Sequence, residues 1–218
     1  MDSGRKIKDL LYEQVARIGK AMSSPKRLEL IELLCQNEKT VDMLARDASI
    51  SMKLASAHLR ELRKTRLVET RREGKNIYYR LSNQKVADFW VFTHTFAEAM
   101  LTDLQSALRD ITSAPAELVP SDRDTLLKAA RNGDIVVLDV RPADEYLSRH
   151  LPFARSIPLG ELQQRIGELP KNRPIVAYCR GPFCLMAKDA VDLLNRQGYQ
   201  GIHLKEGVAE WSIPYSTR

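Results

Sequence analysis

Two cysteines, five positions apart, are the residues best suited to chemistry in this sequence of 218 residues. Cys179 directly follows the apolar run 174–178, and Cys184 ends the segment CRGPFC, after which a run with helical spacing begins. Reactive groups in open α/β sheets lie beyond the carboxyl ends of strands. The backbone N–H groups of a tight loop that enters a helix favour an anion at that point. We therefore expect Cys179 to be a thiolate nucleophile, with its pKa below the free value of ~8.5.

The segments around this loop alternate between helical and strand patterns, as a parallel α/β fold requires. The apolar runs at 135–140, 174–178 and 202–204 predict strands, the first two of them buried on both faces. Helical spacing predicts helices over 122–131, 143–148, 162–169 and 185–197. The expected architecture is a central parallel sheet with helices on both faces.

Four motifs in this half, taken in order, resemble a rhodanese domain over about residues 117–215. They are LDVRPADEY (138–146), HLPFARSIPL (150–159), the CRGPFC loop, and EGVAEW (206–211). The resemblance implies that Cys179 attacks a sulfane-sulfur donor and holds the extra sulfur as a persulfide within an amide cradle that includes Gly181. It also implies that Arg180 steers an anionic donor and that Phe183 walls the pocket. Asp139 and Arg141 either support the loop or are plain structural ion partners.

The loop departs from the rhodanese pattern at two positions. Pro182 removes one N–H group from the cradle, and Cys184 stands where many rhodaneses have a basic residue. Cys184 is either a resolving thiol that closes a disulfide onto Cys179, or a buried structural cysteine. Related phosphatases and arsenate reductases need an arginine six places after the cysteine. Leu185 occupies that place, which disfavours both activities.

The first half of the chain concentrates positive charge in one segment. Residues 53–85 contain ten basic and three acidic side chains, in a chain whose net charge is +6. The segment reads as a helix followed by a hairpin that turns at Gly74, with Leu54, Ala55, His58, Leu59 and Leu62 on one helical face. Such a helix can enter the major groove while the hairpin touches phosphate. The candidate DNA contacts are Ser51, Met52, Lys53, Ser56, His58, Arg60, Arg71, Arg72 and Lys75.

Residues 10–105 resemble the ArsR/SmtB family of winged-helix repressors. The resemblance rests on PKRLELIELL, VDMLA, the run from Ser51 through HLRELRKTRLV, and RREGKNIYYRL. We expect Ser24 to cap the first of these helices, with Pro25 at its first position. The family binds palindromic operators as homodimers and releases them when an inducer binds. The resemblance implies that helices over 6–22 and 89–108, each apolar on one side, form the dimer.

The usual metal ligands of this family are missing. Residues 39–42 are Lys-Thr-Val-Asp, where many relatives have a cysteine pair. His94 and Glu98 form a pair four residues apart, but packing in the dimer is the more common role of such a histidine. Cys35 is interpreted as a small core residue. We expect no metal and no cofactor.

Composition places the chain among ordinary globular proteins, with 44% hydrophobic residues. Residues 1–110 carry 20 basic and 15 acidic side chains, and residues 111–218 carry 14 and 13, so only the first half favours nucleic acid. There is no apolar run of ~20 residues and no signal-peptide core, which predicts a cytoplasmic protein with no membrane partner. We expect a DNA-binding and dimerisation domain over 1–111, a linker over 112–116, and a rhodanese-like domain over 117–218.

The combined hypothesis is a homodimeric repressor whose rhodanese-like domain senses or transfers sulfane sulfur. Its expected partners are double-stranded operator DNA and a donor such as thiosulfate, a polysulfide or a persulfide. Two alternatives remain open: a sulfurtransferase enzyme that carries a DNA-binding domain, and a metal-responsive repressor.

Overall fold

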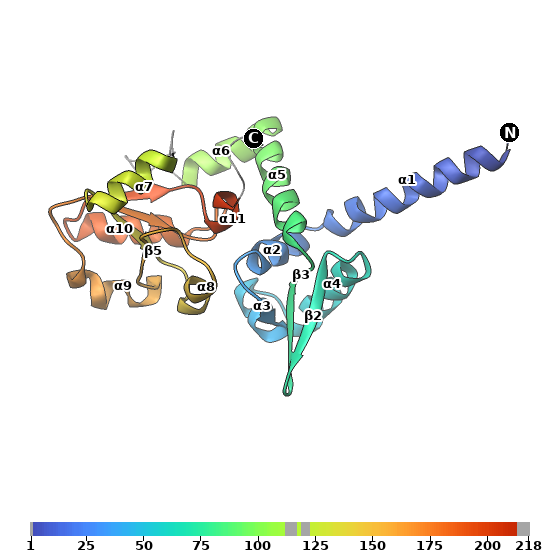
Figure 1. Ribbon diagram of the computed structural model, residues 1–218, viewed down its shortest axis with the longest axis horizontal. Helices are drawn as coiled ribbons and strands as arrows, with labels where there is room; N and C mark the ends of the chain where they lie inside the picture. The colour runs from blue at the N-terminus through green and yellow to red at the C-terminus, as the bar shows by residue number, and fades with distance from the viewer. Residues whose placement is uncertain (1, 112–116, 119–122, 213–218) are drawn as a thin grey trace. The chain divides into compact units, whose positions relative to one another are not determined.

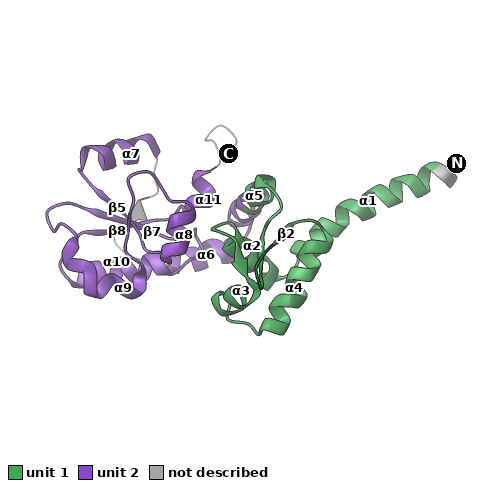
Figure 2. Cartoon of the chain, turned by 60° about the horizontal axis from the view of Figure 1, so that its bottom comes forward, with its two compact units in different colours: residues 1–90 green, residues 91–218 purple. Residues whose placement is uncertain are grey.

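The structure is a computed structural model that describes residues 2–111, 117–118 and 123–212. The chain divides into two compact units, residues 1–90 and 91–218 (Figure 2). The helix α5 (Gln84–Met100) spans the boundary, so its first turns belong to one unit and its last turns to the other. The predicted linker, 112–116, lies outside the described residues.

The first unit is a winged helix-turn-helix. Helices α3 and α4 pack on α2, and the two strands of the wing follow α4 directly. A short strand at the start of α3 adds a third member to the antiparallel sheet, whose order is β1-β3-β2. The elements are α1 (Asp2–Met22), α2 (Pro25–Leu34), β1 (Lys39–Thr40), α3 (Val41–Asp47), α4 (Met52–Lys64), β2 (Val68–Glu73) and β3 (Asn76–Leu81).

The starts of α2 and α4 are capped differently. Pro25 is the first residue of α2, as predicted, but Ser24 makes no side-chain capping bond at that end. Ser51 caps α4, because its hydroxyl accepts a hydrogen bond from the N–H of Leu54 at 3.2 Å. The core face of α4 consists of Ala55, Leu59 and Leu62. Leu54 is exposed, which corrects the prediction that it faces inward.

The helical pattern predicted over 89–108 is two helices rather than one. α5 ends at Met100, and α6 runs over Thr102–Ile111. The side-chain amide of Gln105 donates to the Glu98 carbonyl at 2.8 Å, which satisfies a backbone group that the end of α5 leaves free. A periodic apolar pattern does not reveal such a break, because both helices keep apolar residues at helical spacing.

The second unit contains a parallel five-stranded sheet of order β4-β8-β7-β5-β6 (Figure 1). The predicted strands over 135–140, 174–178 and 202–204 are present as its central members. The short strands β4 and β6 lie at its edges and were not predicted. The strands are β4 (Glu117–Leu118), β5 (Val136–Asp139), β6 (Arg155–Ser156), β7 (Ile175–Tyr178) and β8 (Gly201–Leu204).

Helices cover both faces of this sheet, as the sequence predicts. One apolar core joins β5 and β7 to Leu162 of α9 and to Ala187, Val191 and Leu194 of α10. The other joins them to Leu126 of α7 and Val208 of α11. Figure 1 shows α7 on one side of the sheet and α9 and α10 on the other. The helices are α7 (Arg123–Asn132), α8 (Ala143–Ser148), α9 (Leu159–Arg165), a 3-10 turn (Ile166–Glu168), α10 (Met186–Arg196) and α11 (Val208–Trp211).

Across the described ranges, none of the helices has the length and apolar character that a membrane crossing demands.

Candidate sulfur-reactive loop and DNA-reading surface

The CRGPFC segment forms a closed loop at the carboxyl end of β7. Cys179 is the residue after the last strand residue, Tyr178, and α10 begins two residues after Cys184. The N–H of Cys184 donates to the carbonyl of Gly181 at 3.1 Å, which holds the loop as a tight turn. The sequence therefore placed the two cysteines correctly between a buried strand and a helix.

The two cysteine side chains are neighbours within the loop, and each shifts the pKa of the other. Cys179 is only 2% exposed, and its Sγ also lies 3.2 Å from the carbonyl oxygen of Cys184, as a donating S–H would. The N–H groups of Ala187 and Gly181 point at the same sulfur. Burial outweighs these two amide contacts, so the pKa of Cys179 lies well above its ordinary value.

The pKa of Cys184 is shifted in the opposite direction. Its side chain is half-buried, and the hydrogen bond from the Cys179 thiol lowers the pKa of Cys184 to about 7. The N–H groups of Arg180 and Met186 and the charge of Arg180 act in the same direction. The directions of the two pKa shifts favour the thiolate on Cys184 and the protonated form on Cys179. Burial opposes the lowering of the Cys179 pKa that the amide cradle led us to expect, because a sequence shows the amides but not the loss of water.

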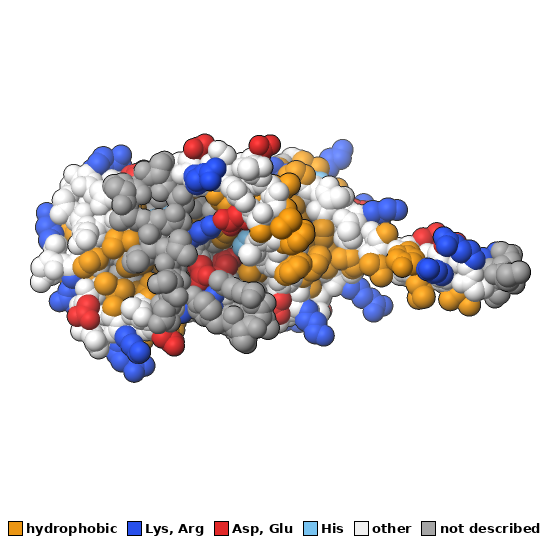
Figure 3. All heavy atoms as spheres, turned by 90° about the horizontal axis from the view of Figure 1, so that it is seen from above, with side chains coloured by type: hydrophobic (Ala, Val, Ile, Leu, Met, Phe, Trp, Pro, Cys, Tyr) orange, Lys and Arg blue, Asp and Glu red, His pale blue; other side chains and the backbone are white. Residues whose placement is uncertain are grey.

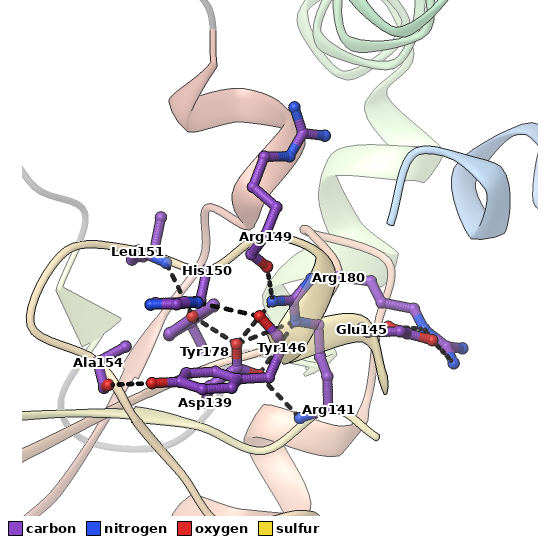
Figure 4. A network of polar contacts seen from close by, with 10 residues as sticks. All are labelled: Asp139, Arg141, Glu145, Tyr146, Arg149, His150, Leu151, Ala154, Tyr178 and Arg180. Atoms are coloured by element: carbon purple, nitrogen blue, oxygen red, sulfur yellow. Dashed lines mark hydrogen bonds and ion pairs between the residues drawn. The ribbon is translucent and has the colours of Figure 1, made fainter. Parts of the chain in front are cut away.

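A buried polar network anchors the strand that carries the loop (Figure 4). The Arg141 guanidinium bonds to Asp139 at 2.6 Å and to the Arg149 carbonyl at 2.7 Å. The Tyr178 hydroxyl donates to Asp139 and accepts from the N–H of Leu151. Asp139 and Arg141 are fully buried, so each charge needs the other. Their position is that of structural partners behind the loop.

Arg180 is fixed by a similar contact. Its guanidinium lies 2.6 Å from Glu145 Oε1 and 3.0 Å from Oε2, and the Glu145 side chain is fully buried (Figure 4). Glu145 belongs to α8, within the predicted LDVRPADEY motif. Arg180 is thus tied to the neighbouring segment, and the donor-steering role that the resemblance implied would require it to leave this pair.

Gly207 and Glu210 close the other side of the loop. A Cβ atom on Gly207 would lie 2.3 Å from the Arg180 carbonyl oxygen, so only glycine allows the two backbones to approach this closely. Glu210 Oε2 accepts the Gly207 N–H at 2.7 Å. Glu210 Oε1 lies 3.2 Å from where a Cβ atom on Gly181 would be. The loop backbone therefore rests directly on a buried carboxylate.

Phe183 packs against a histidine from α5 instead of against another loop residue. The rings of Phe183 and His94 meet edge to face, with centroids 5.5 Å apart. His94 is 5% exposed, and its Nε2 lies 3.1 Å from Glu210 Oε1. Sequence reasoning treated His94 only as a packing residue or a metal ligand, because its partner lies 116 residues further along the chain.

The predicted DNA-contact residues of α4 lie on its outer side. Met52, Lys53 and Arg60 are exposed, as is the capping residue Ser51, whereas Ser56 and His58 are half-buried. Burial and the nearby positive charge of Arg27 lower the pKa of His58, which favours the neutral ring. At the tip of the wing, Gly74 adopts a positive φ of 57°, and Lys75 next to it is exposed.

Arg71 differs from its neighbours in the wing. Its guanidinium pairs with Glu38 and lies 2.7 Å from Glu73, above the ring of Tyr78. The hydrogen bonds that Arg71 donates to these two carboxylates raise its pKa. Arg72 is exposed and donates to the carbonyl of Gly74 at 3.2 Å. The charge on Arg71 is thus already balanced within the protein, whereas Lys75 presents its ammonium to solvent.

The residues considered for metal binding have other contacts. His94 contacts Glu210, and Glu98 pairs with Lys205, so the predicted pair does not converge on one point. Within 2–111, 117–118 and 123–212, no three histidine, cysteine or acidic side chains gather as a metal site would require. Cys35 is buried in the first unit, as a core residue would be.

The fold and these sites define a DNA-binding transcriptional regulator of the winged-helix class that carries a rhodanese-like domain. The sequence model described as "Bacterial regulatory protein, arsR family" matches residues 24–70, and the rhodanese-like domain model matches 122–213. A relative named HTH-type transcriptional regulator Rv0324, from Mycobacterium tuberculosis, is 38% identical over 206 residues, covering 94% of this chain and 90% of its own. The chain belongs to the ArsR family of transcriptional regulators.

Two further comparisons concern one half of the chain each. A sulfurtransferase from Allochromatium vinosum is 29% identical over 86 residues, or 39% of this chain and 78% of that protein. The solved homodimeric winged helix-turn-helix domain of Mb0332 from Mycobacterium bovis is 38% identical. That match covers 44% of this chain and 89% of the solved chain, with a TM-score of 0.42.

Sequence reasoning missed the acidic residues that support the loop. Glu145 and Glu210 both lie inside motifs that the resemblance used, yet neither was assigned a role. Both are buried, and each has the partner that a buried acidic side chain requires: Arg180 for Glu145 and His94 for Glu210. The only available signal was their place in the motifs, because nothing in a linear pattern distinguishes a buried acid from an exposed one.

Proposed function

We propose that this regulator is a repressor that reads sulfane sulfur through the pair Cys179 and Cys184 and then releases its operator. The observation that carries the proposal is the tight turn that holds the two cysteines together, with Cys179 Sγ 3.2 Å from the Cys184 carbonyl oxygen. Cys179 is buried with a raised pKa, whereas Cys184 is half-buried with its pKa lowered to about 7. A thiolate at neutral pH attacks sulfane sulfur, and a second thiol in contact with it can complete the exchange.

The chemistry balances with a polysulfide as the oxidant. The Cys184 thiolate attacks the terminal sulfur of the polysulfide, forms a persulfide, and releases the shortened chain as its anion. Cys179 then loses its proton and attacks the Cys184 Sγ. An Sγ–Sγ bond forms and hydrosulfide leaves with the electron pair. The two cysteines are oxidised, and the sulfane sulfur is reduced to hydrosulfide.

A dimer on operator DNA is the second part of the proposal. Apolar side chains stand exposed along α1, among them Leu11 and Val15, and Figure 3 shows hydrophobic side chains along this helix. Phe92 and Phe96 of α5 are exposed and stacked on each other, with ring centroids 6.0 Å apart. An apolar surface of this kind is characteristic of subunit contacts. Two copies paired through these helices would present two α4 helices to successive turns of DNA.

The test is operator affinity before and after modification. A labelled duplex, selected in vitro from a random-sequence library, serves as the probe, and fluorescence anisotropy gives Kd for reduced and polysulfide-treated protein. We expect treatment to weaken binding by about 5- to 150-fold, the usual range of allosteric coupling. Intact mass distinguishes a persulfide, heavier by one sulfur atom, from a disulfide, lighter by two hydrogen atoms.

Three serine variants complete the experiment. Cys184→Ser should neither be modified in the loop nor release DNA, whereas Cys179→Ser should stop at the persulfide. Cys35→Ser is the matched control, because Cys35 is buried in the first unit, and it should respond like the wild type. Equal Kd values for treated and untreated wild-type protein, with the loop demonstrably modified, would contradict the sensing function.

A second candidate is sulfurtransferase activity, favoured by the relative from Allochromatium vinosum that bears that name. It predicts catalytic turnover of thiosulfate to thiocyanate with cyanide as acceptor. Loss of that turnover in Cys184→Ser and Cys179→Ser, together with unchanged operator affinity under sulfane sulfur, would favour an enzyme over a sensor. The nearly complete burial of Cys179 argues against rapid turnover at that atom.

A further inference from the structure

The cysteine loop contacts helix α5 through one buried histidine. His94 Nε2 lies 3.1 Å from Glu210 Oε1, and the His94 ring meets the ring of Phe183 edge to face. Phe183 is the residue next to Cys184 in the chain. A bond between Cys184 and Cys179 would therefore form directly beside the side chain that packs on His94.

Glu210 ties His94 to the backbone of the loop as well. One of its carboxylate oxygens accepts the Gly207 N–H at 2.7 Å, and the other faces both His94 and Gly181. The Glu210 side chain is only 6% exposed, so water cannot readily replace these contacts. The carboxylate thus holds its place relative to both the loop and the helix.

An ion pair makes a second contact with α5, one turn after His94. Glu98, four residues after His94, pairs with Lys205, which directly precedes the EGVAEW motif. The same helix begins at Gln84, three residues after the wing strand β3 ends at Leu81. One continuous helix backbone therefore joins His94, in the second unit, to the residues that follow the wing in the first unit.

We infer that His94, held by Glu210 and Phe183, is the positioning residue that couples the state of the cysteine loop to helix α5 and so to operator binding. The inference rests on the proposed function for the identity of the signal. The coupling itself has a separate consequence: because the loop and α5 share these contacts, operator binding should also change the packing around the loop thiols and so the rate at which they react.

The reciprocal effect gives a test without any sulfur donor. The rate at which iodoacetamide alkylates Cys184 is measured by peptide mass mapping of the reduced full-length protein. It is measured with and without the duplex selected in vitro from a random library. We expect saturating duplex to change the wild-type rate at least about 5-fold, the lower end of allosteric coupling. The same duplex should change the alkylation rate of the His94→Ala variant by less than about 2-fold, because this variant lacks the contacts with Glu210 and Phe183.

Two further variants separate coupling from folding. His94→Gln keeps a side-chain N–H that can reach Glu210 and should retain part of the effect, whereas Phe183→Leu should reduce it. His150→Gln is the matched control, since His150 is an exposed histidine of the same unit, stacked on Tyr146. Thermal unfolding of each variant checks that the fold is kept.

The inference is overturned if duplex leaves the wild-type alkylation rate unchanged, or if His94→Ala responds as the wild type does. Failure of the proposed function would look different. In that case sulfane-sulfur donors leave the loop thiols unmodified, although duplex still alters the alkylation rate of Cys184 through His94.

Discussion

The guanidinium of Arg180 lies 2.6 Å from a fully buried carboxylate oxygen of Glu145, so the residue next to Cys179 is fixed by a partner from another element of the fold. The contact joins the reactive loop to α8. It also explains how a loop with a proline and a glycine keeps one conformation around its two thiols.

Glu145→Gln should therefore destabilise the second unit. The substitution leaves the Arg180 charge, whose side chain is 14% exposed, without its counter-charge, and breaking a buried pair costs about 3 kcal/mol. Urea denaturation measures the difference. Glu161→Gln is the control, because Glu161 pairs with Arg165 in solvent and should change stability by less than about 1 kcal/mol. Equal effects of the two substitutions would contradict the anchoring role.

The reactivity of Cys184 should depend on pH with a midpoint of about 7, because the hydrogen bond from Cys179 lowers the pKa of its thiol. Cys179→Ala removes that hydrogen bond and should move the midpoint upward. Iodoacetamide alkylation rates between pH 5 and pH 10, on the order of the range that thiols titrate, measure both midpoints. An unchanged midpoint in the variant would show that the two thiols do not share a proton.

The same shifts fix the sign of a stability effect. A thiol whose folded pKa is lowered contributes stability that is present above the unfolded value of ~8.5 and is lost as pH falls through about 7. The raised pKa of Cys179 acts in the opposite direction, and its contribution is lost as pH rises above ~8.5. Wild-type protein should therefore gain stability relative to Cys184→Ser between about pH 7 and ~8.5.

Gly207→Ala should displace the loop, because the new Cβ atom would lie 2.3 Å from the Arg180 carbonyl oxygen. We expect a loss of about 3 kcal/mol, at the upper end of overpacking effects, together with faster alkylation of Cys179. Gly160→Ala is the matched control in the same unit. A Cβ atom on Gly160 would meet nothing within 4 Å, so stability should hold or rise slightly. A tolerated Gly207→Ala would rule out the close backbone approach.

Lys75 and Arg71 of the wing should contribute differently to the salt dependence of DNA binding. Lys75→Ala should lower the slope of log Kd against log salt by about 0.9, since its ammonium is free to neutralise one phosphate. Arg71→Ala should change the slope much less, because Glu38 and Glu73 already balance that charge. Anisotropy titrations at several salt concentrations measure the slopes, with Lys188→Ala of α10 as control. A larger loss of slope for Arg71 than for Lys75 would show that Arg71 leaves its acids to bind DNA.

Local pattern and motif order were enough to predict both folds. Alternating apolar runs predicted the parallel sheet, and the charged helix and hairpin predicted the winged helix, because periodicity reports which side of an element is buried. The position of the two cysteines between β7 and α10 followed from the same pattern. The exposure of Met52, Lys53 and Arg60 on α4 agrees with the sequence pattern. The exposure of Leu54 does not, since an isolated apolar position does not reveal which side of a helix has a neighbour.

By itself, the sequence determined that this protein pairs a DNA-reading unit with a cysteine loop at the end of a strand. Only the tertiary structure decided that the pKa values of the two thiols shift in opposite directions, because water exclusion at Cys179 depends on everything packed around it. It alone also brought His94 to Glu210 across 116 positions and turned Arg180 toward Glu145. Contacts between distant segments are set by how the elements pack, and no local pattern in the chain encodes them.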